Sequence, residues 1–154
     1  MPESNDTHPR KSWRQLIPVI MYIILSIVGL FDSLLLTVEH YSRRGLPCSF
    51  TGGCERVLTS KWSEVFGIPI SLGGVVFYGL ILYLVIHSLV NKTSLNRYFM
   101  LGWSLIGLIT SAYLTAIQAF IIKAWCQYCL LSALTTTLVF ILSMLIFYRA
   151  RSNK

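Results

Sequence analysis

Four long apolar runs constrain this chain more than any other feature of its sequence. They cover residues 16–38, 68–90, 99–122 and 124–147, and each is 23 or 24 residues long. At about 1.5 Å per residue, a helix of this length measures roughly 35 Å and can cross a ~30 Å hydrocarbon core. Backbone groups in lipid must be hydrogen-bonded within their own segment, so the runs are predicted to be helices. The expected fold is an all-α integral membrane protein, a bundle of four transmembrane helices.

The composition supports this class, because 55% of the 154 residues are hydrophobic and only 12% are charged. A water-soluble domain this apolar would be hard to keep in solution. Residues 1–15 are polar and basic, and the apolar run after them is too long for a signal-peptide core, which predicts a retained signal-anchor helix. The predicted membrane domain is 16–148, between tails at 1–15 and 149–154.

The distribution of Lys and Arg predicts the orientation. Eight of these residues fall on the side of the two termini, and five fall on the other side. The positive-inside rule then places both termini in the cytoplasm, so the loop 39–67 and the turn at Lys123 face outward. The net charge of +7 is explained by topology, and no nucleic-acid partner is expected. The expected location is the inner (cytoplasmic) membrane, in contact with the lipid bilayer.

All four cysteines fall on the predicted outer side, where disulfides persist. Cys48 and Cys54 form a spaced pair in the loop, and Cys126 and Cys129 form a Cys-x-x-Cys pair at the head of the last helix. The N-terminal amides of a helix stabilise a thiolate, and a thiolate of low pKa both attacks and leaves readily in disulfide exchange. Two such pairs beside a bilayer could pass electrons to a lipid-soluble acceptor.

The segment after the spaced pair is predicted to be a short amphipathic helix on the membrane surface. Within residues 55–66, the side chains of Leu58, Trp62, Val65 and Phe66 would share one helical face. We interpret this helix as a lid over the outer mouth of the bundle. A simple surface anchor is the alternative.

The start of the second predicted helix is rich in small residues. Pro69 suits the first turn of a helix, and Gly73 and Gly74 remove side chains from its outer third. This leaves room either for a closely packed neighbouring helix or for a flat ring beneath the lid.

Asp32 is the only ionisable residue deep within a predicted span apart from His87, which lies near the inner end of its helix. A carboxylate within a membrane is costly and by default marks function. Asp32 could relay protons to a reduced acceptor, or it could bond to Ser or Thr on neighbouring helices. His40 closes the first helix at the surface, as a solvated end or as a group that handles protons.

An internal repeat relates the first and third predicted helices. SIVGLFDSLLLT at 26–37 and SLIGLITSAYLT at 104–115 are identical at six of twelve positions. The same shift of 78 carries Cys48 onto Cys126. The two helices are either copies of one another or alike because small-residue packing faces in membrane helices tend to look alike.

These motifs resemble the vitamin K epoxide reductase family, and more specifically its bacterial homologues, here without a fused thioredoxin-like domain. The matching elements are Cys48 and Cys54, Ser60 and Trp62, FGIP at 66–69, Gly74 and CQYC at 126–129. The resemblance implies a four-helix bundle that holds a quinone near its outer end, covered by a half-helix of the loop.

The resemblance also implies roles for individual residues. Cys129 would contact and reduce the quinone, and Cys126 would exchange with Cys54. Cys48 would receive electrons from a partner protein. The quinone-binding residues expected from the resemblance and from position are Cys129, Ser60, Trp62, Phe66, Gly74 and Asp32.

Two departures from the vertebrate members favour plain quinone reduction over vitamin K epoxide reduction. LLSA at 130–133 replaces a Thr-Tyr-Ala triplet, and an apolar residue near Ile70 replaces a polar Asn. The expected function is that of a thiol:quinone oxidoreductase. It would reoxidise a separate periplasmic thioredoxin-fold (DsbA-like) protein and reduce ubiquinone or menaquinone, which supports disulfide bond formation in exported proteins.

Three other hypotheses make different predictions. A DsbB-like oxidase would carry its Cys-x-x-Cys in the first outer loop, the reverse of the order found here. A zinc-binding membrane protein would hold one metal ion with four thiolates, whereas the favoured function needs no metal. A small four-helix transporter would use Asp32 as its coupling carboxylate and would still transport without cysteines.

Overall fold

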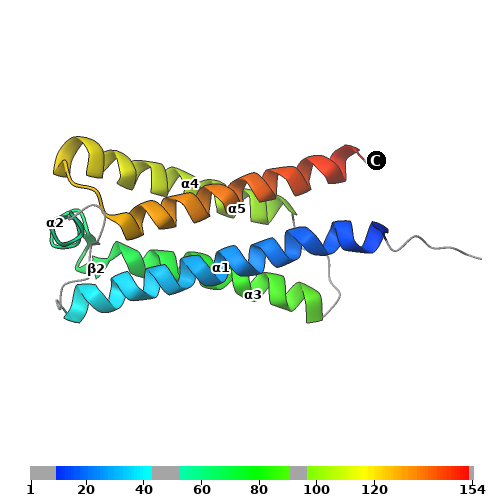
Figure 1. Ribbon diagram of the computed structural model, residues 1–154, viewed down its shortest axis with the longest axis horizontal. Coiled ribbons are helices and arrows are strands. Elements are labelled where there is room, and N and C mark those ends of the chain that lie inside the picture. Colours follow the sequence, from blue (N-terminus) through cyan, green and yellow to red (C-terminus); the bar gives the residue numbers. More distant parts are fainter. Residues whose placement is uncertain (1–9, 43–52, 91–96, 153–154) are drawn as a thin grey trace, which may run out of the picture.

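The computed structural model describes residues 10–42, 53–90 and 97–152, and four long helices dominate these ranges (Figure 1). In chain order the elements are α1 (Arg10–Ser42), α2 (Cys54–Leu58), β1 (Glu64–Val65), β2 (Ile68–Pro69), α3 (Ile70–Val90), α4 (Arg97–Ala116), the π-helical segment η1 (Ile117–Ile122) and α5 (Gln127–Ser152). The stretches long and apolar enough to cross a membrane are Ile17–Ser42, Ile70–Val90, Tyr98–Ile122 and Gln127–Arg149. The predicted all-α membrane bundle is confirmed.

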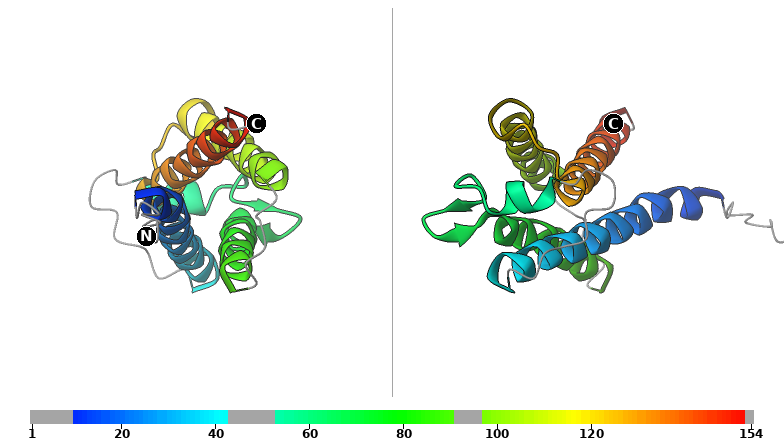
Figure 2. Two further views of the ribbon diagram at one scale, coloured as in Figure 1. Left: turned by 90° about the vertical axis from the view of Figure 1, so that its right-hand side faces the viewer. Right: turned by 60° about the vertical axis from the view of Figure 1, so that its left-hand side comes forward.

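The helices are packed unevenly around the bundle axis. α1 lies against α3 and α5, and α4 lies against α5 (Figure 2). Among the described helices, α3 and α4 are not a closely packed pair. Trp103 of α4 stacks on Phe77 of α3, with ring centroids 6.0 Å apart, so these helices meet at that level. The start of α1 and the end of α5 lie at the end of the bundle opposite α2 (Figure 1).

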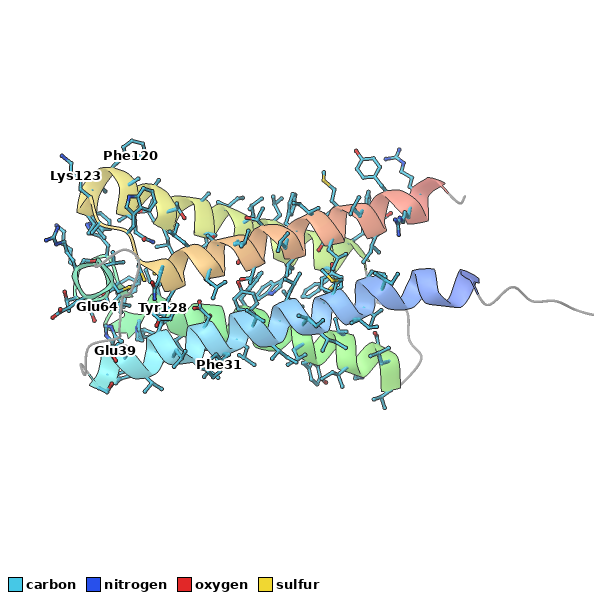
Figure 3. All side chains as sticks on the ribbon, in the orientation of Figure 1. Phe31, Glu39, Glu64, Phe120, Lys123 and Tyr128 are labelled. Carbon is cyan, nitrogen blue, oxygen red and sulfur yellow. The ribbon has the colours of Figure 1, made fainter. Side chains whose placement is uncertain are left out.

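Two apolar clusters form the core of the bundle. One contains Tyr22, Leu25, Ile81, Val85, Met100 and Val139. The other lies around α2 and contains Leu36, Cys54, Val57, Ala124 and Cys126. Many other large apolar side chains face outward, such as Phe31, which is 64% exposed (Figure 3). An apolar exterior of this kind suits helices that are surrounded by lipid.

The repeated small residues of α1 and α4 receive two aromatic rings from α3. A Cβ atom at Gly29 would collide with the ring of Tyr78, and one at Gly107 would come within 2.5 Å of the ring of Phe77. The two rings are in edge-to-face contact with each other, 5.0 Å apart. The equivalent serines Ser26 and Ser104 are completely buried. The small-residue face therefore allows close approach, as predicted.

The predicted amphipathic helix over residues 55–66 is wrong in its extent, because α2 ends at Leu58. The hydroxyl of Thr59 donates to the carbonyl of Glu55, and that of Ser60 donates to the carbonyl of Val57. Such bonds from Ser and Thr compete with helix propagation and favour turns. The chain then forms the antiparallel pair β1 and β2.

The hairpin between β1 and β2 also changes where Phe66 points. Phe66 and Gly67 form its tip, with φ of 53° and 78°, and Phe66 is fully exposed. The prediction that Phe66 shares a face with Leu58 and Trp62 is wrong for this reason. Pro69 was expected in the first turn of a helix, but it lies in β2 opposite Glu64, and α3 begins one residue later.

The last connection differs from the prediction in a way that matters for the site. α4 continues into the π-helical segment η1. The residue after η1, Lys123, is in the left-handed region with φ of 53°. α5 begins at Gln127, three residues later than the predicted start at 124. Cys126 is therefore not inside a helix, but is the residue immediately before one.

Candidate active site

The Cys-x-x-Cys pair lies at the start of α5, with its two thiols free. Cys126 is completely buried, and its sulfur accepts a hydrogen bond from the backbone N–H of Cys129 at 3.4 Å. The carbonyl of Cys126 accepts the N–H of Leu130 at 3.0 Å, so Cys126 caps the helix. A sulfur in this position faces the unpaired amides of the first turn.

The thiol of Cys129 makes Cys126 the more acidic member of the pair. Its hydrogen bond to the Cys126 sulfur is the main cause that holds the pKa of Cys126 below the ordinary value, and it outweighs the opposing effect of burial. Backbone N–H groups of Cys129 and Tyr128 act in the same direction. In this reduced state the thiolate character lies on Cys126, with Cys129 as its hydrogen-bond donor.

Cys54 lies in the same buried cluster as Cys126, although the two residues are far apart in sequence. Cys54 is completely buried and disulfide-bonded, and it is the first residue of α2. A Cβ at the preceding Gly53 would come within 2.8 Å of the carbonyl oxygen of Trp125, so glycine permits the close approach of these segments. Cys48 lies outside the described residues.

A cavity of about 340 Å³ lies beneath α2 and the turn after it. This volume falls within the range of ~300–1,000 Å³ that is usual for small-molecule sites. Leu58, Ser60 and Trp62 cover its outer end, and Phe77 and Trp103 lie on its walls. The cavity is bordered by both α3 and α4, the two helices that are not closely packed together.

Four of the six residues expected to bind a quinone line this cavity, namely Cys129, Ser60, Trp62 and Gly74. Gly74 also serves helix packing, because a Cβ there would collide with the hydroxyl of Ser33 on α1. Phe66 and Asp32 are not among the lining residues. Phe66 is at the exposed hairpin tip, which removes the basis for its expected role.

Asp32 is close enough to Cys126 to act on it electrostatically, and it does not line the cavity. It is 2% exposed, and neither carboxylate oxygen has a hydrogen-bond partner in the described parts of the chain. The expected bonds to Ser or Thr are therefore not formed there. Its negative charge acts to raise the pKa of Cys126, against the larger lowering effect of Cys129. A buried carboxylate without partners is costly, which points to a use in the reaction.

The cavity is also bordered by His40, which the sequence places at the end of a helix, and by Gln118, which is not among the predicted site residues. His40 Nε2 lies 3.7 Å from Oε2 of Glu64 in the hairpin, a distance at which a protonated imidazole forms an ion pair. Gln118 of η1 is 3% exposed, and its Oε1 accepts the backbone N–H of Cys126 at 3.0 Å. The sequence does carry a signal for Gln118: apart from Gln127, no other Asn or Gln lies within the predicted spans.

No group of three or more His, Cys, Asp or Glu side chains within the described ranges is placed to hold a metal ion. A four-thiolate zinc site would also need Cys54, which is disulfide-bonded. The described geometry therefore gives the zinc hypothesis no support.

A bundle of membrane helices with a free Cys-x-x-Cys pair beside an apolar cavity is the arrangement expected of a membrane-embedded oxidoreductase. Comparison with protein families agrees, because the model of the vitamin K epoxide reductase family matches residues 20–144, most of the chain. The protein belongs to the vitamin K epoxide reductase family. No curated protein matches it. Members of this family act on thiols and quinones in the membrane, and the protein is a multi-pass membrane oxidoreductase.

Proposed function

We propose that the protein is a thiol:quinone oxidoreductase that reoxidises a thioredoxin-fold, DsbA-like partner and thereby supports disulfide formation in exported proteins. One observation carries this proposal. Cys54 and Cys126 lie in a single buried cluster, and Cys129, one helical turn further on, lines the cavity. This arrangement provides a continuous path for thiol–disulfide exchange from the loop to a lipid-soluble acceptor.

The electron path consists of two exchanges and one reduction. A thiolate of the partner attacks the Cys48–Cys54 disulfide, and the partner leaves oxidised while the loop becomes a dithiol. The Cys54 thiolate then attacks Cys126 of the Cys126–Cys129 disulfide, which forms a Cys54–Cys126 bond and releases Cys129. Attack of the Cys48 thiolate on Cys54 restores the loop disulfide and releases Cys126. A bonded Cys54 together with free Cys126 and Cys129 corresponds to the state reached after these exchanges.

In the last step, the Cys126–Cys129 dithiol is oxidised to a disulfide, and the quinone takes up two electrons and two protons to become a quinol. Cys129 is the member of the pair that lines the cavity, so we assign it the contact with the ring. A DsbA-like donor has a potential near −120 mV, so the drive must come from a more oxidising quinone. We assign Asp32, a buried carboxylate whose oxygens have no partner among the described residues, to proton transfer in this step.

The same proposal includes the orientation and the boundaries of the domain. The membrane domain comprises residues 16–148, and the end that carries α2 and the cysteines faces away from the cytoplasm. The excess of Lys and Arg on the opposite side supports this orientation. The membrane would then be the cytoplasmic membrane, with ubiquinone or menaquinone as the acceptor.

Quinone reduction by the purified protein, driven by a reduced thioredoxin-fold donor, tests the proposal. Wild-type protein should produce quinol, and Cys129→Ala should abolish production. A variant with Cys48→Ala and Cys129→Ala retains Cys54 and Cys126, and it should form a mixed disulfide between them on a non-reducing gel. The matched variant with Cys48→Ala and Cys126→Ala should form much less. Turnover that does not need Cys129, or no Cys54–Cys126 bond, would contradict the proposal.

A further inference from the structure

Gln118 occupies an unusual turn of the backbone. It lies in η1, where the N–H groups of Lys123 and Ala124 both bond to the carbonyl of Gln118. π-helical turns are rare and occur frequently at functional sites. Within this turn Phe120 is 79% exposed and points outward beside Lys123 (Figure 3), whereas Gln118 is buried. The turn therefore directs the one amide side chain of the segment into the protein.

The hydrogen bond to Cys126 fixes the orientation of the Gln118 amide. The backbone N–H of Cys126 can bond only to an acceptor, so the atom 3.0 Å away must be the side-chain oxygen. The two N–H donors of Nε2 consequently point elsewhere. The hydrogen bonds among the described residues include none from Nε2, and Gln118 borders the cavity. A residue that borders the cavity thus carries an amide donor that no described group of the protein accepts.

Several other polar groups of the cavity are already committed as donors. The hydroxyl of Ser60 donates to the carbonyl of Val57, that of Thr115 to Ser111 and that of Thr136 to Ser132, over 2.7 to 2.8 Å. Trp103 Nε1 donates to the carbonyl of Phe77 at 3.4 Å. These groups satisfy helix carbonyls and offer no free proton to a ligand.

A quinone can use such a free hydrogen-bond donor. Its carbonyl oxygens only accept hydrogen bonds, and they gain negative charge as electrons arrive. Fixed donors aimed at developing charge stabilise it most effectively in a site from which water is excluded. We propose, building on the function inferred above, that Nε2 of Gln118 donates a hydrogen bond to one quinone carbonyl oxygen while Oε1 holds the backbone of Cys126.

Gln118 therefore links the acceptor to the donor of electrons. One planar amide contacts the ring on one side and the cysteine pair on the other, which sets the position of the ring relative to Cys129. The amide keeps its protons during the reaction, because the quinol takes its protons from the cysteine pair and through Asp32, to which we assign proton transfer. Gln118 is a binding and positioning residue for the quinone.

The variant Gln118→Glu separates the two contacts. At pH 8 a carboxylate still accepts the N–H of Cys126, but it replaces the donor by a negative charge. Loss of one hydrogen bond to a carbonyl that gains charge is expected to raise the KM for a short-tailed quinone about tenfold or more. The KM for the reduced thioredoxin-fold donor should stay near the wild-type value. Gln127→Glu is the matched control, because it places the same charge beside Cys126 but does not line the cavity.

An infrared spectrum of bound, carbonyl-labelled quinone provides a readout that a structural role would not change. The hydrogen-bonded carbonyl band of the wild-type protein should move to higher frequency in Gln118→Glu, and also in Gln118→Met if the charged variant fails to fold. An unchanged quinone KM with an unchanged carbonyl band in a folded variant would overturn the assignment of Gln118. Wild-type protein that does not reduce quinones would instead contradict the proposed function, so the two failures are distinguishable.

Discussion

Cys126 and Cys129 occupy different environments although only two residues separate them. Cys126 is held before the helix by three hydrogen bonds: its N–H donates to the side chain of Gln118, and its carbonyl and its sulfur accept backbone N–H groups of α5. Cys129 lies within the first turn and reaches the cavity. The sequence predicts that the pair lies at a helix start, but not which sulfur is the thiolate, because that depends on side-chain hydrogen bonds that no spacing rule contains.

The acidity of Cys126 can be measured as a function of pH. In a protein with Cys48→Ala and Cys54→Ala, the pKa of Cys126 should lie below ~8.5, the ordinary value for a thiol. Its thiolate should persist as the pH falls below this value and disappear only at the lower, folded-state pKa. Removal of the donor by Cys129→Ala should shift the transition upward, whereas Cys129→Ser, which retains a donor, should shift it less. Thiolate ultraviolet absorbance would record both; an unshifted curve in Cys129→Ala would contradict the assignment.

Asp32 should contribute to turnover at the expense of stability. Replacement of this buried, unpartnered carboxylate by the apolar residue in Asp32→Leu should raise the free energy of unfolding by about 1–3 kcal/mol. Both Asp32→Leu and Asp32→Asn should slow quinone reduction about tenfold or more if proton transfer uses the carboxylate. Thermal unfolding in detergent and quinone reduction would be measured on the same preparations. Normal turnover in both variants would exclude Asp32 from the reaction.

At the scale of the elements, the apolar pattern predicts the membrane-spanning helices, and local hydrogen bonds of polar side chains determine the shorter elements between them. The four spans could be predicted because each must satisfy its own backbone in a membrane. The end of α2 could not, since it depends on the hydroxyls of Thr59 and Ser60 and on a hairpin that involves Pro69. The π-helical turn of η1 was also beyond prediction, because an apolar run looks the same for an α turn and a π turn.

The packing of α1 against α3 provides a prediction for the repeat. Gly29→Ala would place a methyl group in the ring of Tyr78, and such overpacking should lower the free energy of unfolding by about 1–3 kcal/mol. Gly79→Ala is the matched control on α3, because a Cβ there has no neighbour within 4 Å. The control should match or slightly exceed the wild type in thermal unfolding, as alanine is the better helix former. Equal stability of the two variants would contradict the close packing inferred for Gly29.

At the scale of the whole molecule, the two ends of the bundle differ in chemistry. Cys54, Cys126, Cys129 and α2 share one end, and the start of α1 and the end of α5 lie at the other (Figure 1). The distribution of Lys and Arg predicts which of these ends faces the cytoplasm, and the packing of the helices gives no information about that direction. Orientation therefore comes from the sequence and the membrane, and the cavity comes from the fold.

Labelling of intact cells would test the orientation. In a background without cysteines, Lys123→Cys lies at the end of the bundle that carries α2, called here the redox end, and Arg149→Cys lies at the opposite end. A membrane-impermeant maleimide should label the first variant in intact cells and the second only after the membrane is permeabilised. The reverse pattern would place the redox end in the cytoplasm, where disulfides are kept reduced.

The loose contact between α3 and α4 has a consequence for how the substrate is supplied. A quinone ring that enters between these two helices, which both border the cavity, can leave its prenyl tail dissolved in the bilayer. The protein would then take its substrate from the quinone that diffuses within the bilayer. Its rate should follow the mole fraction of quinone per lipid, and dilution of the vesicles in buffer should leave that rate unchanged.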